Sequence, residues 1–317
     1  AGLVNIVVPP KGFPILHVPV GRLNSVSPTE KILTLLKLPL ALLTSWTILR
    51  KHHPKFVLGV GGYASGPVLL VASFLRIPTA IWEPNAMPGL TNRILSRFVD
   101  ECFLVFESAK IHLSSRAFVP SGMPVRQEIE NAGKNASPSG KNILIFGGSQ
   151  GSRVLNTIVF EMCKTSADFV SGHEIVHQTG ATDYSRVKAL YGSQVKNLEV
   201  VEYLHDMEKR YTWADVVISR AGAASVAELA ACGKVAILIP LPTAADNHQQ
   251  KNAEALAKNG AAIMILQKDL TPEKLRTTLL DLEVNSEKRK AMEENIKKFH
   301  HPSAAEKIAQ HLMQRIL

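Results

Sequence analysis

Short apolar runs alternate with segments of helical spacing along most of the chain. Several of the runs are nearly continuously apolar, a pattern typical of strands in a parallel sheet covered on both faces. We expect strands at residues 55–60, 78–83, 101–106, 142–147, 173–178, 198–204, 214–219 and 235–240. The segments between them, such as GSRVLNTIVFEMCKT and AASVAELAACGK, have the apolar spacing of helices. The alternation predicts an α/β fold with doubly wound sheets.

One stretch interrupts this alternation with the composition of a linker. NAGKNASPSGK, at residues 131–141, is rich in Gly, Ser, Asn and Pro and has no periodic apolar residues. We therefore expect two α/β domains, at residues 1–133 and 141–301. The last residues, 302–317, have helical spacing after a break at Pro302, and we expect this helix to pack back on the first domain.

A long apolar segment, KILTLLKLPLALLTSWTILRKHH, lies at residues 31–53. Lys37 and Pro39 interrupt it, so it lacks the roughly 18 uninterrupted apolar residues of a membrane span. We interpret it as an amphipathic helix or a pair of helices. Four large apolar residues fall near helical spacing with basic residues around them, namely Leu36, Leu40, Leu43 and Trp46. This pattern suits a patch on a membrane surface and equally suits packing against the core.

Composition narrows the classes of partner. Lys and Arg number 36 against 27 Asp and Glu, which gives a net charge of +9. A basic balance fits phosphates, anionic lipid or nucleic acid, and also a basic protein with no anionic partner. Aromatic residues make up only 6% and are not interleaved with the basic ones, so we predict no nucleic-acid partner. Cys102, Cys163 and Cys232 form no CxxC pair, so we expect buried thiols rather than disulfides or a zinc site.

Three of the expected strands end in glycine-bearing turns, VGGYASGP (60–67), FGGSQGSR (146–153) and SRAGAAS (219–225). A helix that begins after such a turn presents backbone N–H groups and the positive end of its dipole, where a phosphate can bind. Ordinary strand-to-helix turns have the same composition. None of the three is a P-loop or a clean G-x-G-x-x-G fingerprint. Together they favour a phosphate-bearing ligand.

Glu228 lies three residues after Ser225, at the start of the helix that SRAGAAS introduces. Two roles fit this spacing. The carboxylate could cap the helix as the acid of a capping box, Ser-Val-Ala-Glu. It could instead point to the mouth of the helix and accept hydrogen bonds from a sugar diol, one hydroxyl for each oxygen. Spacing alone favours the capping box.

As a set, the motifs closely resemble the MurG family of UDP-N-acetylglucosamine:lipid I glycosyltransferases. The resemblance rests on segments that occur in order along most of the chain: LGVGGYASGP (58–67), EPNAMPGLTNR (83–93), MPVR (123–126), FGGSQGSRVLN (146–156), HQTG (177–180), YLHDM (203–207), ADVVISRAGAASVAELAACGK (214–234) and DNHQQKNAEAL (246–256). It implies a GT-B fold, two Rossmann-like domains facing across a cleft, with the second domain binding UDP-GlcNAc.

The resemblance also implies roles for individual residues. Glu228 would bind the ribose hydroxyls, which reverses the preference for a capping box. Leu204 would read uracil through its backbone, and Asn85 and Gln249 would contact the GlcNAc hydroxyls. The diphosphate would lie against a set of residues at two helix mouths and one basic side chain: Arg126, Ser149, Ala223, Ala224, Ser225, Val226 and Ala227. The implied reaction is an inverting transfer of GlcNAc to the C4 hydroxyl of the muramoyl sugar of lipid I, giving lipid II.

The resemblance further implies a peripheral protein on the cytoplasmic face of the bacterial plasma membrane, docked through residues 31–53, with no cofactor. The sequence has no Asp-x-Asp pair, so we predict no metal site. The family begins with a strand and a GGTGGH-type loop that carries a His proposed as base, and neither occurs here. We therefore expect an incomplete first domain, no catalytic base in this chain and impaired activity. Pro84 also stands where the family usually has Gln.

Two other readings compete with this one. Another GT-B enzyme that uses UDP-GlcNAc, such as a 2-epimerase, would share the donor site but need no lipid acceptor. The segments YASGP and EPNAMPGLTNR argue against it. A donor-binding protein without catalytic activity would fit the absence of a GGTGGH-type loop. His177, in HQTG, could line the cleft, but we expect a structural role for it and for His52, His53 and His205.

Overall fold

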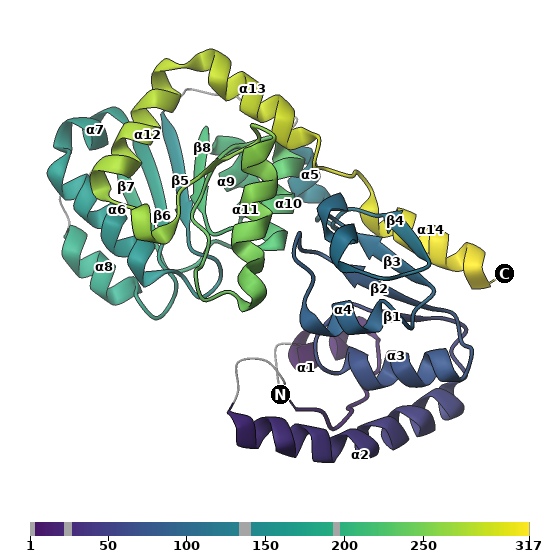
Figure 1. The fold of residues 1–317 in the computed structure, drawn as a ribbon. Helices are drawn as coiled ribbons and strands as arrows, with labels where there is room; N and C mark the ends of the chain where they lie inside the picture. The colour runs from purple at the N-terminus through teal and green to yellow at the C-terminus, as the bar shows by residue number, and fades with distance from the viewer. Residues whose placement is uncertain (1–3, 22–26, 133–140, 193–196, 317) are drawn as a thin grey trace.

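The structure, a computed structural model, describes residues 4–21, 27–132, 141–192 and 197–316. It contains two parallel sheets, each covered by helices on both faces (Figure 1). The centre of the expected linker lies outside the described residues. The chain forms the front sheet first, then the back sheet, and returns to the front sheet with its last helix.

The front sheet has four strands in the order β1-β2-β3-β4: β1 (Val57–Gly59), β2 (Thr79–Glu83), β3 (Glu101–Leu104) and β4 (Ala117–Pro120). Side chains alternate between its two faces, as the strand period of two requires. Ile81 and Cys102 pack towards the helices α3 (Ser65–Phe74) and α4 (Leu90–Leu95). Ala80 and Phe103 pack against Ile308 of the last helix, α14 (Ala304–Ile316), on the opposite face.

The back sheet has six strands in the order β10-β9-β8-β5-β6-β7. Their bounds are β5 (Asn142–Phe146), β6 (Glu174–Gln178), β7 (Leu198–Val201), β8 (Val216–Ser219), β9 (Val235–Leu238) and β10 (Ile263–Met264). Read from β7 to β10, this is the Rossmann strand order. The strands are added outwards from β5 on one side and from β8 on the other, so the order of addition reverses between these two neighbours. Crevices at the carboxyl ends of strands beside such a reversal are the usual ligand sites of these folds.

Helices cover both faces of the back sheet. One core contains residues of α6 (Arg153–Thr165), α7 (Ala167–Gly172), α8 (Tyr184–Tyr191) and α12 (Pro272–Val284). The other contains residues of α5 (Gln127–Ala132), α9 (Met207–Trp213), α10 (Ala223–Cys232) and α11 (His248–Lys258), and α13 (Ser286–Lys297) contributes to both. Short elements complete the described chain: α1 (Val4–Val7), η1 (Pro9–Lys11), η2 (Glu107–His112), η3 (Ala245–Asn247) and η4 (Gln267–Asp269).

Two segments pack away from their neighbours in sequence. Helix α5 precedes the expected linker, yet Ile129 is fully buried in the back-domain core with Tyr211 and Leu229. The chain therefore passes from the front sheet to the back domain between β4 and α5. At the other end, His311 of α14 lies edge-on to Phe103, and both His311 and Arg315 contact Glu101 at the start of β3.

All eight expected strands are present, and β4 and β10 are additional. Neither carried a strand signal, because AFVP has only two large apolar residues before its proline and β10 has only two residues. All three cysteines are free and buried, as predicted.

The apolar segment forms one helix, α2 (Pro28–His52), with Pro39 inside it. Its inner side contributes Ala41 and Leu49 to the core. Its outer side differs from that of an ordinary amphipathic helix, because Leu36, Leu40 and Leu43 are 71%, 56% and 66% exposed. By length and composition alone, Ile32–His52 would suffice to cross a membrane, a test that buried helices of soluble proteins also pass.

Candidate functional site: the carboxyl edge of the back sheet

A cavity of about 520 Å³ opens at the carboxyl edge of the back sheet, beside the reversal of strand order. The loop after β5, Gly147 to Ser152, forms one wall. Gly148 and Gly151 have φ of +87° and +72°, which only glycine adopts readily. A Cβ at Gly151 would also collide with the carbonyl oxygen of Thr179. The backbone conformation of this loop therefore requires glycine at these positions. Without side chains there, an anion can approach the backbone of the loop closely.

Ser149 and Gln249 both line this cavity. Ser149 is exposed in the loop after β5. Gln249, at the start of α11, accepts a hydrogen bond from the backbone N–H of Leu241 at 3.0 Å. The structure thus brings together two residues that are 100 positions apart in the sequence.

Arg220 is the most buried basic side chain that lines the cavity, and the sequence motifs gave it no role. It is 7% exposed and directly follows β8. Its guanidinium donates to the carbonyl oxygens of Ile239 and Pro240, both at 3.1 Å. It also donates to Ser152 Oγ at 2.6 Å and to Gln267 Oε1 at 2.8 Å.

All four acceptors of Arg220 are neutral, and no ion pair involves it within the described part of the chain. Burial lowers the pKa of its guanidinium, although arginine stays charged at neutral pH. A desolvated cation beside an open cavity attracts an anion. Arg220 therefore makes this cavity electropositive while tying the loop after β5 to the ends of β9 and η4.

Helix α10 begins three residues earlier than the capping box requires. Its N-cap is Gly222, which is extended (φ −65°, ψ 146°) and makes no side-chain cap. Ser225 is consequently the third helical residue, so the capping-box alternative is wrong. Ala223, Ala224 and Ser225 form the first turn, where N–H groups have no partner within the helix, and Val226 and Ala227 are buried behind them.

Glu228 projects from the second turn of α10 into a half-buried position. Tyr211, which is fully buried, donates its hydroxyl to Glu228 Oε2 at 3.0 Å. Arg126 Nη2 lies 3.9 Å from the other oxygen, Oε1. Burial raises the pKa of the Glu228 carboxyl, and the contacts with Tyr211 and Arg126 oppose that rise. One carboxylate oxygen is held rigidly, and the other retains capacity to accept hydrogen bonds.

Asn85 lies on the front domain and meets the back domain through Asn252. The Nδ2 of Asn252 donates to Asn85 Oδ1 and to the carbonyl oxygen of Ala221, both at 3.1 Å. Its Oδ1 accepts from the backbone N–H of Ala86 at 2.8 Å. Asn252 is fully buried and lies one turn after Gln249 on α11. Its hydrogen bonds therefore link α11 to the segment before α10 and to the segment after β2.

The carboxylate of Glu83 fixes the other side of Asn85. This buried side chain, 1% exposed, accepts from the N–H and Nδ2 of Asn85 at 3.0 and 3.2 Å. It also accepts from Asn92 Nδ2 at 2.8 Å. Nearby, Arg93 forms an ion pair with Asp246 of the back domain at 3.1 Å. Asn85 is thus a preorganised polar group at the domain junction.

The remaining sequence-derived candidates have simpler positions. Leu204 is buried in the core that also contains Tyr211 and Val226. His177 is fully buried, bonded to Asn156 and Tyr191, and burial lowers its pKa to about 3. It is a neutral structural residue, in agreement with the structural role expected for it. Among the described residues, no group of three His, Cys, Asp or Glu side chains could hold a metal ion.

Comparisons with known proteins decide the family. The glycosyltransferase family 28 N-terminal domain matches residues 2–104, and the C-terminal domain of the same family matches residues 142–308. A relative from Bdellovibrio bacteriovorus is 48% identical over 99% of this chain and 88% of its own length. It is named UDP-N-acetylglucosamine--N-acetylmuramyl-(pentapeptide) pyrophosphoryl-undecaprenol N-acetylglucosamine transferase. The crystal structure of Acinetobacter baumannii MurG superposes with a TM-score of 0.78 at 31% identity, covering 99% of this chain and 88% of that one. This chain belongs to the MurG family.

Membership in the MurG family confirms the resemblance and the two-domain GT-B fold. A relative from Anaeromyxobacter sp. carries the same transferase name and is 44% identical over 97% of this chain and 81% of its own length. The UDP-GlcNAc 2-epimerase of Neisseria meningitidis, bound to UDP-GlcNAc, has a TM-score of 0.62 at 16% identity, covering 92% of this chain and 84% of that one. That likeness shows a shared fold alone, so the 2-epimerase alternative is not favoured.

Proposed function

We propose that this MurG-family chain transfers GlcNAc from UDP-GlcNAc to the C4 hydroxyl of the muramoyl sugar of lipid I, with inversion, to give lipid II. The observation that carries the proposal is the 48% identity, over nearly the whole chain, to a relative named for this transfer. The cavity beside the β5–β8 reversal supports it, because its glycine-rich loop and buried Arg220 suit a nucleotide diphosphate.

In this proposal the diphosphate lies between two helix mouths. The loop with Ser149 and the first turn of α10 offer backbone N–H donors, and Arg220 and Arg126 offer positive charge. UDP gains negative charge as it leaves, and preorganised donors stabilise such charge without rearranging. Arg126 borders Glu228 rather than the glycine-rich loop, so it would reach the phosphates from the ribose side.

Glu228 would bind the ribose diol with its less constrained oxygen, and the backbone at Leu204 would bind uracil. Asn85, which is hydrogen-bonded to Asn252, and Gln249, which lies three residues before Asn252 on α11, would contact the GlcNAc hydroxyls. The attacking hydroxyl needs a base for its proton. We assign no residue of this chain to that role.

The same proposal places α2 on the cytoplasmic face of the bacterial plasma membrane. Trp46 is exposed on the same helix as the exposed leucines, and its ring lies 6.2 Å from that of Phe74. Arg50 lies 5.0 Å above the Trp46 ring. An apolar helix face with cations at its end suits a surface that rests in the headgroup region of a bilayer. No nucleic-acid partner is proposed.

Donor binding tests the proposed site directly. In a calorimetric titration with UDP-GlcNAc and no added metal, we expect saturable binding that Glu228→Ala abolishes and Glu228→Gln weakens about tenfold to a hundredfold, because hydrogen bonds to a charged acceptor are lost. Affinity should also fall as the pH drops through the raised pKa of Glu228, since protonation removes an acceptor. The Gln variant should lack this acidic limb.

Glu294→Gln is the matched control, because Glu294 is exposed on α13. It should bind UDP-GlcNAc like the unaltered chain. If Glu228→Gln binds the donor equally well at every pH, Glu228 does not hold the ribose and the site assignment fails.

Membrane docking predicts a second result. Leu36→Glu or Leu43→Glu should lower co-sedimentation with phospholipid vesicles about tenfold or more, because each removes about 1.5–3 kcal/mol of apolar burial and adds a charge. Val284→Glu is the control, since Val284 is 82% exposed on α12 of the back domain. Equal losses in all three variants would show that docking is not through α2.

A further inference from the structure

The glycine-rich loop after β5 packs against a second turn, the one that follows β6. In this second turn, Thr179 and Gly180 come directly after the strand. A Cβ at Gly151 would collide with the carbonyl oxygen of Thr179, and a Cβ at Gly180 would lie 2.5 Å from the carbonyl oxygen of Gln150. The two backbones therefore meet with no spare room between them, so the position of Thr179 determines where the loop after β5 can lie.

Asn156, a fully buried residue of α6, holds Thr179 in place. Its Nδ2 donates to the carbonyl oxygen of Thr179 at 3.0 Å and to Asp183 Oδ2 at 2.8 Å. Arg186 donates to both oxygens of Asp183, at 2.6 and 2.7 Å, and these hydrogen bonds lower the pKa of Asp183. Asp183 is therefore a carboxylate at neutral pH. Both hydrogens of the Asn156 amide nitrogen thus go to groups that can only accept.

This arrangement determines which nitrogen of His177 carries the hydrogen. Because Nδ2 of Asn156 must face its two acceptors, Oδ1 faces His177 Nε2, at 3.1 Å. An amide oxygen can only accept, so Nε2 of His177 is the donor. Burial lowers the pKa of His177 to about 3, which keeps the ring neutral, and its bare Nδ1 accepts from the Tyr191 hydroxyl at 3.4 Å. The hydrogen bonds therefore run in one direction, from Tyr191 through His177 and Asn156 to Thr179.

Core packing alone does not explain a histidine at this position. His177 is fully buried on β6, two residues after Ile175 and therefore on the same face of the sheet, where an apolar side chain would also fit. Among the described residues, His177 is the one donor to Asn156 Oδ1. An apolar residue in its place would leave a buried oxygen without a donor, which favours rearrangement of the amide.

We propose that His177 is a positioning residue for the donor diphosphate. Its hydrogen bond to Asn156 fixes the carbonyl group of Thr179, and Thr179 in turn fixes Gly151 in the loop after β5. The histidine of HQTG thereby takes part in donor binding although its side chain is fully buried. The inference rests on the proposed function, in which the loop after β5 binds the diphosphate of UDP-GlcNAc.

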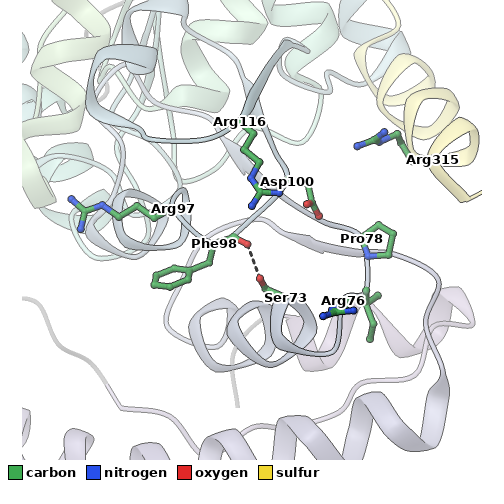
Figure 2. Close-up of a pocket in the computed structure, with 9 residues that line it drawn as sticks. Ser73, Arg76, Pro78, Arg97, Phe98, Asp100, Arg116 and Arg315 are labelled. Carbon is green, nitrogen blue, oxygen red and sulfur yellow. Dashed lines mark hydrogen bonds between the residues drawn. The ribbon is translucent and has the colours of Figure 1, made fainter.

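The test compares two amide side chains at position 177 in the full chain. In His177→Gln the terminal nitrogen can lie where Nε2 lies and donate to Asn156. In His177→Asn the shorter side chain reaches only the position of Nδ1, so this donation is lost. Thr79→Val is a control for the loss of a buried hydrogen bond elsewhere, because the Thr79 hydroxyl donates to Asp100 at 3.0 Å. Asp100 lines a cavity of about 510 Å³ at the amino edge of the front sheet (Figure 2).

Affinities are measured below the melting temperature of each variant, by calorimetry for UDP-GlcNAc and by NMR titration for uridine, which has no phosphate. We expect His177→Asn to bind UDP-GlcNAc about tenfold more weakly and to bind uridine unchanged, because only the phosphates contact the loop after β5. His177→Gln and Thr79→Val should stay within threefold for both ligands, even where the melting temperature falls. A histidine that served stability alone would distinguish neither the two amides nor the two ligands.

A second measurement does not depend on how the variants fold. In the unaltered chain at neutral pH, the imidazole nitrogen signals of His177 in an NMR spectrum should show a protonated Nε2 and a bare Nδ1. The inference is overturned by the opposite tautomer, or by equal UDP-GlcNAc affinities of His177→Gln and His177→Asn when the unaltered chain binds the donor. If the unaltered chain does not bind UDP-GlcNAc, the proposed donor site itself is wrong, and the inference fails with it.

Discussion

Replacing Arg220 with methionine should reduce kcat/KM for UDP-GlcNAc by at least about a hundredfold. The side chain is 7% exposed and has no carboxylate partner among the residues that the structure describes, so a bound diphosphate would be its counter-ion. Removing one partner of a buried charge pair costs about 2–5 kcal/mol. Methionine replaces the aliphatic part of the side chain and removes the charged guanidinium, so we expect the loss to appear in donor affinity.

Stability must be measured alongside activity, because Arg220 also donates to Ile239, Pro240, Ser152 and Gln267. Leaving such acceptors unpaired costs about 1–3 kcal/mol each when they are buried. Urea unfolding of the variant, with and without UDP-GlcNAc, separates the two effects. In the unaltered chain the donor should raise the unfolding midpoint, and in Arg220→Met it should not.

Two further variants define the role of Arg220. Arg220→Lys keeps the charge but cannot donate the same set of hydrogen bonds. Its kcat/KM should therefore lie between those of the unaltered chain and Arg220→Met. Arg276→Met removes an arginine whose ion pair with Asp168, at 3.2 Å, lies on the outer surface of the back domain. Kinetics of that variant should stay within twofold of the unaltered chain. A donor affinity in Arg220→Met within threefold of normal would show that Arg220 is a structural residue only.

The sequence predicted five of the six strands of the back sheet, because several of them are nearly continuous apolar runs, and it missed the two-residue β10. It failed at β4, where AFVP is short, only partly buried and ends in proline. It also placed the domain boundary after α5, because the linker composition begins there. Helix α5 belongs to the back domain because Ile129 is buried in the same core as Tyr211. These residues are 82 positions apart, and the local pattern of apolar residues in a sequence does not reveal packing over that separation.

The donor site was predictable in part. The glycine-rich loop with Ser149, the helix mouth at Ala223 and the acid at Glu228 each lie in a local motif. The start of α10 was not predictable from spacing, because both Gly222 and Ser225 suit an N-cap and only the backbone angles distinguish them. Arg220 and Glu83 were in quoted motifs. The partners of Arg220 lie in other segments of the chain, whereas Asn85 and Asn92, the partners of Glu83, lie in the same motif as Glu83. A charged residue at the end of an apolar strand was the signal that could have identified both.

Replacing Asn252 with aspartate should be the second severe change, with kcat/KM lowered about a hundredfold or more at pH 8. Aspartate has the same shape but no Nδ2, so its second oxygen would face the Oδ1 of Asn85 and the carbonyl oxygen of Ala221 at about 3.1 Å. Facing acceptors repel, and a fully buried carboxylate without a cation is strongly destabilised. The domain junction should loosen at the point where Asn85 and the start of α10 meet.

The pH dependence distinguishes this explanation from a general loss of packing. Burial and two facing acceptors should raise the pKa of the introduced carboxyl, because both favour its neutral form. At lower pH the protonated acid could again donate one hydrogen bond, so activity relative to the unaltered chain should recover between pH 8 and pH 6.

Asn259→Asp is the matched control, since Asn259 donates to Ala255 O at 2.8 Å from an exposed position at the end of the same helix. Its activity ratio should stay near one at both values of pH. A loss in Asn252→Asp that is the same at pH 6 and pH 8 would mean that the side chain fills space at the junction rather than linking the two domains by its hydrogen bonds.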